Sequence, residues 1–338
     1  MNGPALVTGA SGFLGRPLVA SLLASGRPVT ALCRRPEDLA GLAGPAGRLR
    51  VVPADLRQPE SWRPLLEPGM SVFHLAAARN GPAVPAQEME RVNVDATLAL
   101  AARAAEVGVA RFVHVATALI YGPSNGRPRT EEDGTAAALG SYARSKAAAV
   151  RALGELAEAG LPAVVVCPTL VYGPDAPGHP NRLTAEMRRL LRTRLEVRIG
   201  GGRQPRDLVH VDDVVRGLLL AEERGRPGEE LILGGEDVAP RDFSRIVLAQ
   251  AGLKARAVLP VPAGLARAAA RTADRLRRFE AGCGYSSAVQ TLSLAWRFSS
   301  GRARRRLGYE PVPLAEGIGR TLRWLHSSER NRTQDAEP

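Results

Sequence analysis

The chain has 338 residues, of which 45% are hydrophobic and 24% are charged. That balance is typical of a globular protein and excludes a disordered tail protein, a collagen-like fibre and a disulfide scaffold. No apolar run reaches the roughly 18 residues that a membrane-spanning helix needs. A strand-like run begins at residue 5, which leaves no room for a signal peptide before it. Because the three cysteines are scattered, we expect buried free thiols in a reducing cytoplasm.

The net charge of +12 is unevenly distributed, since residues 1–169 carry +3 and residues 170–338 carry +9. Nucleic-acid binding is not expected, because aromatic residues make up only 4% of the chain and no basic stretch is interleaved with them. Arginine accounts for 44 of the 46 basic residues, which favours a biased codon pool as the origin of the charge. An acidic ligand or a membrane surface is the alternative.

The first half of the chain alternates short apolar runs with segments in which apolar residues recur every three or four positions. The runs have the length of strands: Ala5–Thr8, Val29–Cys33, Leu49–Pro53, Val72–Leu75, Val109–Ala116 and Ala163–Pro168. Continuous hydrophobicity is typical of strands that are covered on both faces. Strand–helix alternation with short loops therefore predicts an α/β fold with a doubly wound parallel sheet of the Rossmann type.

After Pro168 this alternation ends. The pattern predicts helices at 183–194, 211–223, 240–251 and 262–279, a strand at Glu230–Leu233, and two short helices between 299 and 326. We expect a first domain at 1–169, to which 205–235 returns, and a smaller C-terminal α/β domain built from 170–204 and 236–326. The polar residues 327–338 are expected to form a flexible tail.

A glycine-rich segment, Thr8–Gly15, links the first predicted strand to the first predicted helix. Its glycines permit a tight turn and close approach of the backbone to a pyrophosphate, and the helix N-terminus offers free N–H groups to the phosphates. The first domain is therefore predicted to bind a dinucleotide. Arg34 stands after the second strand, where an acidic residue would select NAD, and can pair with a 2′-phosphate, which favours NADP. If Arg34 and Arg35 only begin a solvated surface, the choice between NADP and NAD stays open.

Tyr142 and Lys146 lie four residues apart near the start of a predicted helix that runs to about Glu158, so they share one face. An ammonium near a phenol lowers the pKa of the phenol, which would make Tyr142 a general acid/base near neutral pH. Arginine could not replace a compact ammonium, and Lys146 is one of only two lysines. Thr117 ends the fifth strand, at the edge where α/β sheets bind ligands. The alternative interpretation is that Tyr142 and Lys146 form an ordinary pair on the helix surface and that Thr117 has a structural role.

Together these motifs resemble the extended short-chain dehydrogenase/reductase family, also called NAD-dependent epimerases/dehydratases, over roughly residues 4–326. The matching segments are 8–15, 55–56, 74–77, 93–94, 168–174, 206–213 and 307–311, together with Thr117, Tyr142 and Lys146. The resemblance implies that Thr117, Tyr142 and Lys146 are catalytic. It implies a cofactor site that includes Tyr142 and Lys146 together with Gly9, Ser11, Gly12, Phe13, Leu14, Gly15, Arg34, Asp55, Leu56, Leu75, Ala76, Ala77, Asn93 and Pro168. It implies a C-terminal substrate-binding domain and substrate contacts at Ala118, Tyr121 and Arg206.

Two positions depart from the family pattern. Thr117 stands where serine is commoner, and the second strand lacks the acidic residue of the NAD-dependent members.

The resemblance implies hydride transfer between a nicotinamide and a carbonyl or secondary alcohol of a small molecule. The segment 259–279 resembles 3β-hydroxysteroid dehydrogenase-like and dihydroflavonol reductase-like members, which favours a reductase. Arg206-Asp207 instead resembles the segment that binds the diphosphate in nucleotide-sugar epimerases and dehydratases, which keep NAD tightly bound. A cofactor-binding protein without turnover is the third hypothesis.

The amphipathic helix at 262–279 is expected to face the core; a lid that contacts an apolar substrate or a membrane surface is the alternative. We expect a homodimer, as is common in the family. No catalytic metal is expected, because the five histidines show no ligand spacing.

Overall fold

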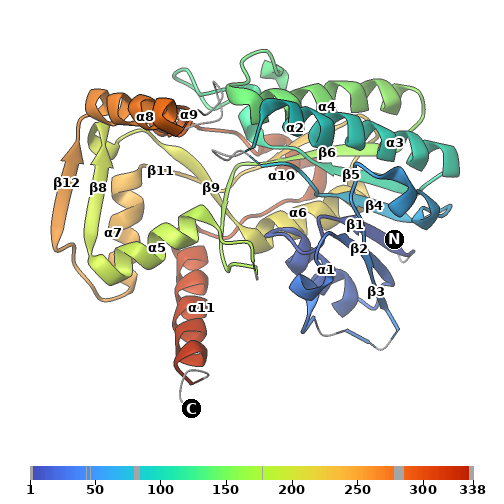
Figure 1. Ribbon diagram of the computed structural model, residues 1–338, viewed down its shortest axis with the longest axis horizontal. Coiled ribbons are helices and arrows are strands. Elements are labelled where there is room, and N and C mark those ends of the chain that lie inside the picture. Colours follow the sequence, from blue (N-terminus) through green and yellow to red (C-terminus); the bar gives the residue numbers. More distant parts are fainter. Residues whose placement is uncertain are drawn as a thin grey trace.

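The computed structural model describes residues 3–334 apart from 43, 46, 80–83, 177 and 278–284. It has two lobes (Figure 1): a sheet lobe built on seven parallel strands and a small lobe that contains two short sheets. The strands of the sheet lobe are β1 (Ala5–Thr8), β2 (Val29–Cys33), β3 (Leu49–Pro53), β4 (Ser71–His74), β5 (Arg111–Val115), β6 (Ala163–Pro168) and β10 (Glu230–Leu233). Their order is β10-β6-β5-β4-β1-β2-β3. Because β1 pairs with β4 on one side and β2 on the other, its carboxyl end opens into the crevice where such sheets bind ligands.

These strands confirm the predicted doubly wound parallel sheet. β1, β2, β3, β6 and β10 have the predicted bounds, while β4 and β5 differ from them by one or two residues at either end. Every position of β1, β4 and β6 is buried, which explains why these strands read as continuous apolar runs in the sequence.

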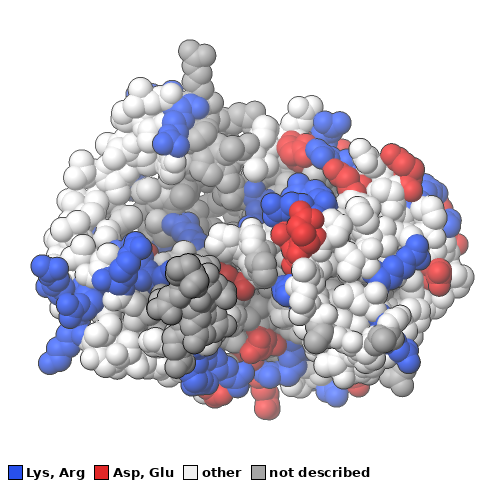
Figure 2. Space-filling model, turned by 60° about the horizontal axis from the view of Figure 1, so that its bottom comes forward, with Lys and Arg blue, Asp and Glu red and all other residues white. Residues whose placement is uncertain are grey.

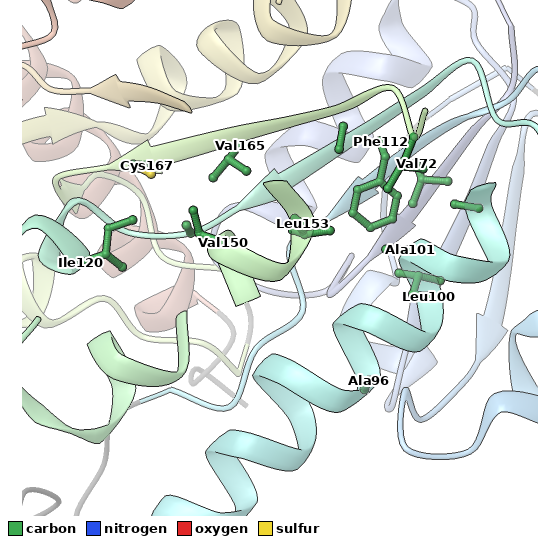
Figure 3. Packing of buried hydrophobic residues seen from close by; sticks show 14 of the residues in the cluster. Val72, Ala96, Leu100, Ala101, Phe112, Ile120, Val150, Leu153, Val165 and Cys167 are labelled. Carbon is green, nitrogen blue, oxygen red and sulfur yellow. The ribbon is translucent and has the colours of Figure 1, made fainter. Parts of the chain in front are cut away.

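Helices cover both faces of the sheet. On one face lie α3 (Ala96–Val107) and α4 (Gly140–Glu158), and on the other lie α1 (Gly15–Ala24), α6 (Val211–Arg224) and α10 (Gly301–Leu307). Figure 3 shows the first of these layers, in which side chains of α3 and α4 pack against Val72, Phe112 and Val165 of the sheet. Within β1, Leu6 joins this layer and Ala5 and Val7 join the other, as alternation along a strand requires.

A buried ion pair ties α6 to the segment before β2. The guanidinium of Arg27 donates to both carboxylate oxygens of Glu222 over 2.7 and 2.8 Å, and both residues are buried. Removal of either partner would leave an uncompensated charge inside the sheet lobe.

The small lobe contains a three-stranded sheet of β7 (Leu170–Tyr172), β9 (Arg206–His210) and β11 (Glu236–Val238), and a separate parallel pair, β8 (Leu195–Ile199) and β12 (Ala257–Val261). Its helices are α5 (Arg182–Thr193), α7 (Pro240–Gln250), α8 (Ala263–Arg277), α9 (Tyr285–Leu292) and α11 (Leu314–Gln334). Apolar residues of α5, α7 and α11 pack around Tyr172 and Leu208 to form its core.

Several elements differ from the prediction. Of the segment 205–235, α6 and β10 join the sheet lobe, whereas β9 pairs with β7 and β11 in the small lobe. The expected tail is helical as far as Gln334, because α11 continues beyond residue 326. Asn93 lies in a π-helical turn, Arg91–Asp95, between α2 (Ala86–Glu90) and α3. Short 3-10 turns occupy Pro36–Leu39, Pro59–Ser61, Arg63–Leu65, Ala118–Tyr121, Glu131–Asp133 and Gly200–Gly202.

The end of the helix predicted at 262–279 and the third cysteine lie outside the described residues. Within the part of the chain that the structure describes, no helix is both long and apolar enough to span a bilayer.

Candidate functional site

The glycine-rich turn lies at the carboxyl end of β1, in the middle of the sheet. Gly9 has a φ of +65°, and a Cβ there would lie 2.8 Å from the backbone nitrogen of Ala76. A Cβ on Gly15, the first residue of α1, would collide with the carbonyl oxygen of Gly9. The other predicted residues of the turn, Ser11, Gly12, Phe13 and Leu14, complete the connection from β1 to α1. The result is a cradle of bare backbone at a helix N-terminus, which fits the pyrophosphate of a dinucleotide.

Charged side chains gather at the ends of β2 and β3, where the adenosine would lie. Hydrogen bonds from Arg57 lower the pKa of Asp55, and the charge of Arg34 contributes to the same effect. Arg35 is paired with Asp38 over 3.0 Å. Arg34 is exposed and makes no hydrogen bond or ion pair to any described residue. Arg34 is therefore the arginine of this group that is available to bind an anionic group of a ligand. Leu56, also predicted at this site, is almost fully buried.

A buried hydrogen-bond chain links the turn to the neighbouring strand ends. The backbone N–H of Ala76 donates to Oγ1 of Thr8 over 3.2 Å, and that hydroxyl lies 2.7 Å from Nδ1 of His74. Nε2 of His74 lies 2.8 Å from Oγ1 of Thr97, which donates to the carbonyl oxygen of Asn93. Because Thr97 gives its proton to Asn93, it accepts one from Nε2–H of His74, while Nδ1 accepts from Thr8. Burial lowers the pKa of His74 to about 3, so its ring is neutral.

The side chain of Asn93 continues this chain to the helix that carries Tyr142. Its Oδ1 accepts from the N–H of Ala78 over 2.8 Å, and its Nδ2 donates to the carbonyl of Ala78 and to Oγ of Ser145, each over 3.0 Å. Ser145 donates in turn to the carbonyl of Tyr142. The predicted cofactor contacts Leu75, Ala76 and Ala77, which are half-buried, are thus held against α4. Asn93 itself is fully buried and supports this loop, and its predicted contact with the cofactor stays a prediction.

Tyr142 and Lys146 lie one turn apart on α4, as predicted. Tyr142 is half-buried, and the loss of solvent raises its pKa to about 12, while the charge of Arg79 opposes the shift. Lys146 is fully buried, and burial lowers its pKa to about 7. The expectation that Lys146 lowers the pKa of Tyr142 is not met in the free protein, because burial disfavours both charged forms.

The ammonium of Lys146 is directed toward the sheet, where sequence reasoning placed no partner. Its Nζ lies 3.2 Å from Nε2 of His114 on β5, and the rings of His114 and His74 are 5.1 Å apart. Burial lowers the pKa of His114, so its ring is also neutral. Nδ1 of His114 has no hydrogen-bond partner among the described residues. The two histidines meet because they are partners in the register of β4 and β5, which the strand-like runs of the sequence do not fix.

Thr117 lies at the carboxyl end of β5, and its Oγ1 accepts the N–H of Leu119 over 3.3 Å. The 3-10 turn that follows, Ala118–Tyr121, packs against α4 and is largely buried. Ala118 and Tyr121 are wholly unexposed, and the hydroxyl of Tyr121 donates to Oε2 of Glu230 over 2.5 Å. Both residues belong to the buried core, and their role as substrate contacts stays a prediction.

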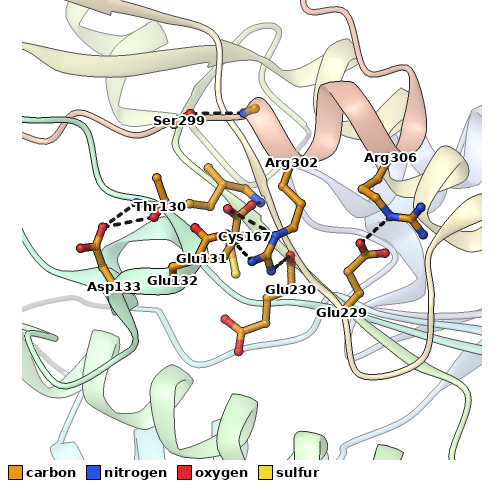
Figure 4. Close-up of polar contacts among 12 residues, drawn as sticks. Thr130, Glu131, Glu132, Asp133, Cys167, Glu229, Glu230, Ser299, Arg302 and Arg306 are labelled. Atoms are coloured by element: carbon orange, nitrogen blue, oxygen red, sulfur yellow. Dashed lines mark hydrogen bonds and ion pairs between the residues drawn. The ribbon is translucent and has the colours of Figure 1, made fainter.

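Glu230 belongs to a polar cluster at the end of the sheet (Figure 4). Sγ of Cys167 lies 3.5 Å from the hydroxyl of Tyr121, and Arg302 donates to the carbonyl oxygen of Glu230 and to the carboxylate of Glu132. Pro168, the last residue of β6, is buried next to Cys167. The cluster explains why Tyr121 turns inward: its hydroxyl finds the half-buried carboxylate of Glu230 there.

Arg206 begins β9, at the junction of the two lobes. Its guanidinium donates to the carbonyl oxygen of Leu292 over 3.0 Å, while Nε is buried without a partner among the described residues. Burial lowers the pKa of Arg206 to about 10, and the charge of Arg182 adds to the effect. Because Arg182 and Arg206 are both positive and Arg206 is partly buried, a bound anion would reduce the repulsion between them.

Comparisons with known proteins agree with this geometry. Residues 5–234 match the NAD dependent epimerase/dehydratase family. The chain is 32% identical over 318 residues to 4-hydroxy-2-methyl-3-oxo-4-farnesyl-3,4-dihydroquinoline-1-oxide ketoreductase of Stigmatella aurantiaca, covering 90% of each protein. It is 31% identical to sterol demethylase protein B of Methylococcus capsulatus, covering 95% of this chain and 97% of that protein.

Among solved structures, a double mutant of DesIV, the dTDP-glucose 4,6-dehydratase of Streptomyces venezuelae with NAD bound, aligns with a TM-score of 0.77 at 28% identity, covering 95% of this chain and 96% of that one. The parallel sheet, the glycine turn and these matches lead to one conclusion: the chain is an enzyme of the NAD-dependent epimerase/dehydratase family, the extended short-chain dehydrogenases/reductases.

Proposed function

We propose that the protein is an NADP-dependent reductase that converts a carbonyl of a small, largely apolar molecule to a secondary alcohol. The observation that carries the proposal is the convergence of three features at one edge of the sheet. The glycine turn follows β1, Thr117 follows β5, and α4, which carries Tyr142 and Lys146, packs against the turn after Thr117. This edge is where doubly wound sheets bind their ligands.

When bound, a nicotinamide cofactor supplies the hydride. The backbone N–H groups at the start of α1 would hold its pyrophosphate, and the ammonium of Lys146 would reach its nicotinamide ribose. Tyr142 gives its phenolic proton to the carbonyl oxygen as that oxygen gains charge, and the hydroxyl of Thr117 donates a second hydrogen bond to the same oxygen. Lys146 then stabilises the phenolate that remains.

Burial raises the pKa of Tyr142 to about 12, which keeps the phenol protonated near neutral pH. A protonated phenol is the form that can give a proton to a carbonyl oxygen.

The preference for NADP rests on Arg34. It is exposed at the end of β2 and makes no hydrogen bond or ion pair to a described residue, unlike Arg35 and Arg57, which pair with Asp38 and Asp55. An unpaired guanidinium can bind a 2′-phosphate in a bidentate fashion.

The names of two relatives support an apolar carbonyl substrate. One is a ketoreductase whose named compound has a 3-oxo and a farnesyl group, and the other is a sterol demethylase protein. The test is NADPH oxidation by the purified protein with a panel of prenylated, steroidal and flavonoid ketones, with NADH in parallel. Turnover of at least one apolar ketone with NADPH is expected; inactivity across the panel together with turnover of a nucleotide sugar would contradict the proposal.

A nucleotide-sugar epimerase or dehydratase is the second candidate. The observation that favours it is the adjacent charge of Arg182 and Arg206, with a buried Nε that has no partner among the described residues. A diphosphate would satisfy both guanidinium groups. Such an enzyme regenerates its cofactor in each cycle and would retain NAD, so the state of the cofactor separates the two candidates. A cofactor-binding protein without turnover, the third hypothesis, would bind NADPH and reduce none of the ketones.

We also propose a homodimer in a reducing, cytoplasmic compartment. Family members commonly dimerise through two helices of each subunit, one of which carries the tyrosine, and α4 would serve here. The two described cysteines, Cys33 and Cys167, are buried free thiols, which suits a reducing compartment. Light scattering would give the mass of the assembly in solution, and a monomer would contradict the dimer.

A further inference from the structure

Nearly all of the net charge lies in two segments of the small lobe. Residues 182–203 and 240–277, here called the basic segments, contain 15 basic and 4 acidic residues, a net charge of +11 out of +12. The rest of the chain contains 31 basic and 30 acidic residues and is nearly neutral. The basic segments form α5, β8, α7, β12 and α8. In Figure 2 the small lobe, on the left, shows mainly blue side chains, whereas the sheet lobe on the right shows both colours. A biased codon pool would not place the excess in one lobe.

Exposed apolar side chains occur in the same segments. Among the described residues, nine large hydrophobic side chains are exposed, and six of them belong to the basic segments: Leu195, Val197, Val258, Leu259, Leu265 and Leu276. Isolated exposed leucines are ordinary on protein surfaces, but a concentration of them within a strongly basic region marks an interaction surface.

The parallel pair β8 and β12 presents one wholly apolar face. Its register pairs Leu195 with Ala257, Val197 with Leu259, and Ile199 with Val261, and alternate residues of a strand share a face. Leu195, Val197 and Leu259 are 39%, 43% and 57% exposed. The opposite face carries Glu196, which is buried, and Val258, which is 42% exposed, and α7 packs against β8. The exposure of Leu195, Val197 and Leu259 shows that the apolar face is open to the outside of the lobe.

Helix α8 follows β12 and is exposed over most of its surface; Ala270 is its one buried residue. Leu265, Ala269, Thr272 and Leu276 follow one another at spacings of four, three and four, which places them in one stripe. The two leucines are 63% and 80% exposed. The arginines at 267, 271 and 275 form a second exposed row, which lies roughly 130° around the helix from the stripe, with Arg275 nearest to it. The helix does not bury the leucines, contrary to the expectation that its apolar side faces the core.

We propose that the basic segments dock the protein on the surface of a bilayer that contains anionic phospholipids. The leucine stripe of α8 and the apolar face of β8 and β12 enter the interface, and the arginines contact the lipid phosphates. A helix with leucines on one exposed side and arginines on another is the pattern of helices that lie in the membrane interface, and each basic residue near such a surface is attracted to it. A nucleic acid would use the arginines but would leave the leucines in water. The inference does not depend on the reaction proposed above.

The test is flotation of the purified full-length protein with vesicles of phosphatidylcholine, alone or mixed in equal parts with phosphatidylglycerol. Binding to the anionic vesicles is expected at low salt, with release as salt rises. In R267Q/R271Q the partition coefficient should fall about fivefold for each arginine removed. In L265S/L276S it should fall at least tenfold, because each leucine loses apolar area to the interface. The control R48Q/R50Q makes the same charge change at exposed arginines of the sheet lobe and should bind like the unmodified protein.

Three outcomes would overturn the proposal. They are no binding to the anionic vesicles at low salt, an equal loss in R48Q/R50Q, and full binding by L265S/L276S. A change of oligomeric state in L265S/L276S would assign the surface to a second copy of the chain, and binding of duplex DNA without vesicle binding would assign it to nucleic acid. Circular dichroism of each variant shows that it is folded, which is expected because every substituted side chain is exposed.

Discussion

The two lobes of this protein differ in their charge balance and in the burial of their apolar side chains. In the sheet lobe, charged groups are balanced, apolar residues are buried on both faces of the sheet, and polar side chains such as His74 and Asn93 are linked by hydrogen bonds. In the small lobe, the basic segments carry +11 and expose six large hydrophobic residues. The comparison suggests a division of labour: the sheet lobe holds the cofactor and the acid/base groups, and the small lobe determines where the protein sits and what reaches it.

The largest expected effect comes from the sheet lobe. In Tyr142→Phe the phenolic proton is lost while the ring remains, so kcat should fall by about 10²- to 10⁴-fold. Binding of NADPH, measured by fluorescence titration, should change little. Tyr285→Phe, at an exposed position of the small lobe, is the matched control and should keep full activity. Retained activity in Tyr142→Phe would refute the role assigned to the tyrosine.

The second prediction concerns stability. Glu222→Ala leaves the guanidinium of Arg27 buried without its carboxylate, which should lower the free energy of unfolding by about 3–5 kcal/mol. Glu223→Ala, at the exposed neighbouring position, should change it by less than about 0.5 kcal/mol. Urea denaturation of the two variants measures the difference. Equal stabilities would mean that the buried pair does not support the sheet lobe.

A third prediction tests the cofactor preference. Arg34→Ala removes a charge-assisted bond to the 2′-phosphate, a loss of about 1.5–3 kcal/mol, so KM for NADPH should rise about 10- to 100-fold. KM for NADH should stay within a factor of about three. Arg35→Ala removes an arginine already paired with Asp38 and serves as the control. Equal changes for both cofactors in Arg34→Ala would remove the argument for NADP.

The last prediction is a pH dependence, which amounts to about tenfold within one pH unit of the pKa of Lys146. Burial lowers the pKa of Lys146 to about 7 in the free protein, so its ammonium is charged below that pH and neutral above it. Since the charged form is the one that stabilises the phenolate, kcat/KM for NADPH should be level below pH about 7 and fall about tenfold per unit above it. A level profile up to pH about 9 would show that the charge of Lys146 is not needed at the binding step.

The sheet was predictable because its signals are local. Short apolar runs such as 163–168 favour strands covered on both faces. The glycines at 9 and 15 lie where a Cβ would collide with neighbouring backbone. The small lobe was harder to predict. Its strands β8 and β12 are short and largely exposed, so their sequences do not stand out as apolar runs. The leucines of α8 have helical spacing but do not pack into the core.

The contacts of the candidate site also differ in how far the sequence could predict them. Tyr142 and Lys146 were predictable because one helical turn places them together. The contact of Lys146 with His114 joins residues 32 positions apart, and that of Thr8 with His74 joins residues 66 apart. The inward rotation of Tyr121 depends on Glu230, which lies 109 positions away. Spacing within one segment carries no information about such partners.

The measurement that tests the central claim most directly is the state of the cofactor in the purified protein. The protein is unfolded, any released nucleotide is identified, and exchange is timed on a native sample. A reductase must replace its cofactor after every turnover, so the account predicts an empty site, or a rapidly exchanging one that prefers NADPH. Stoichiometric NAD that exchanges slowly would contradict it and assign the protein to the epimerases and dehydratases.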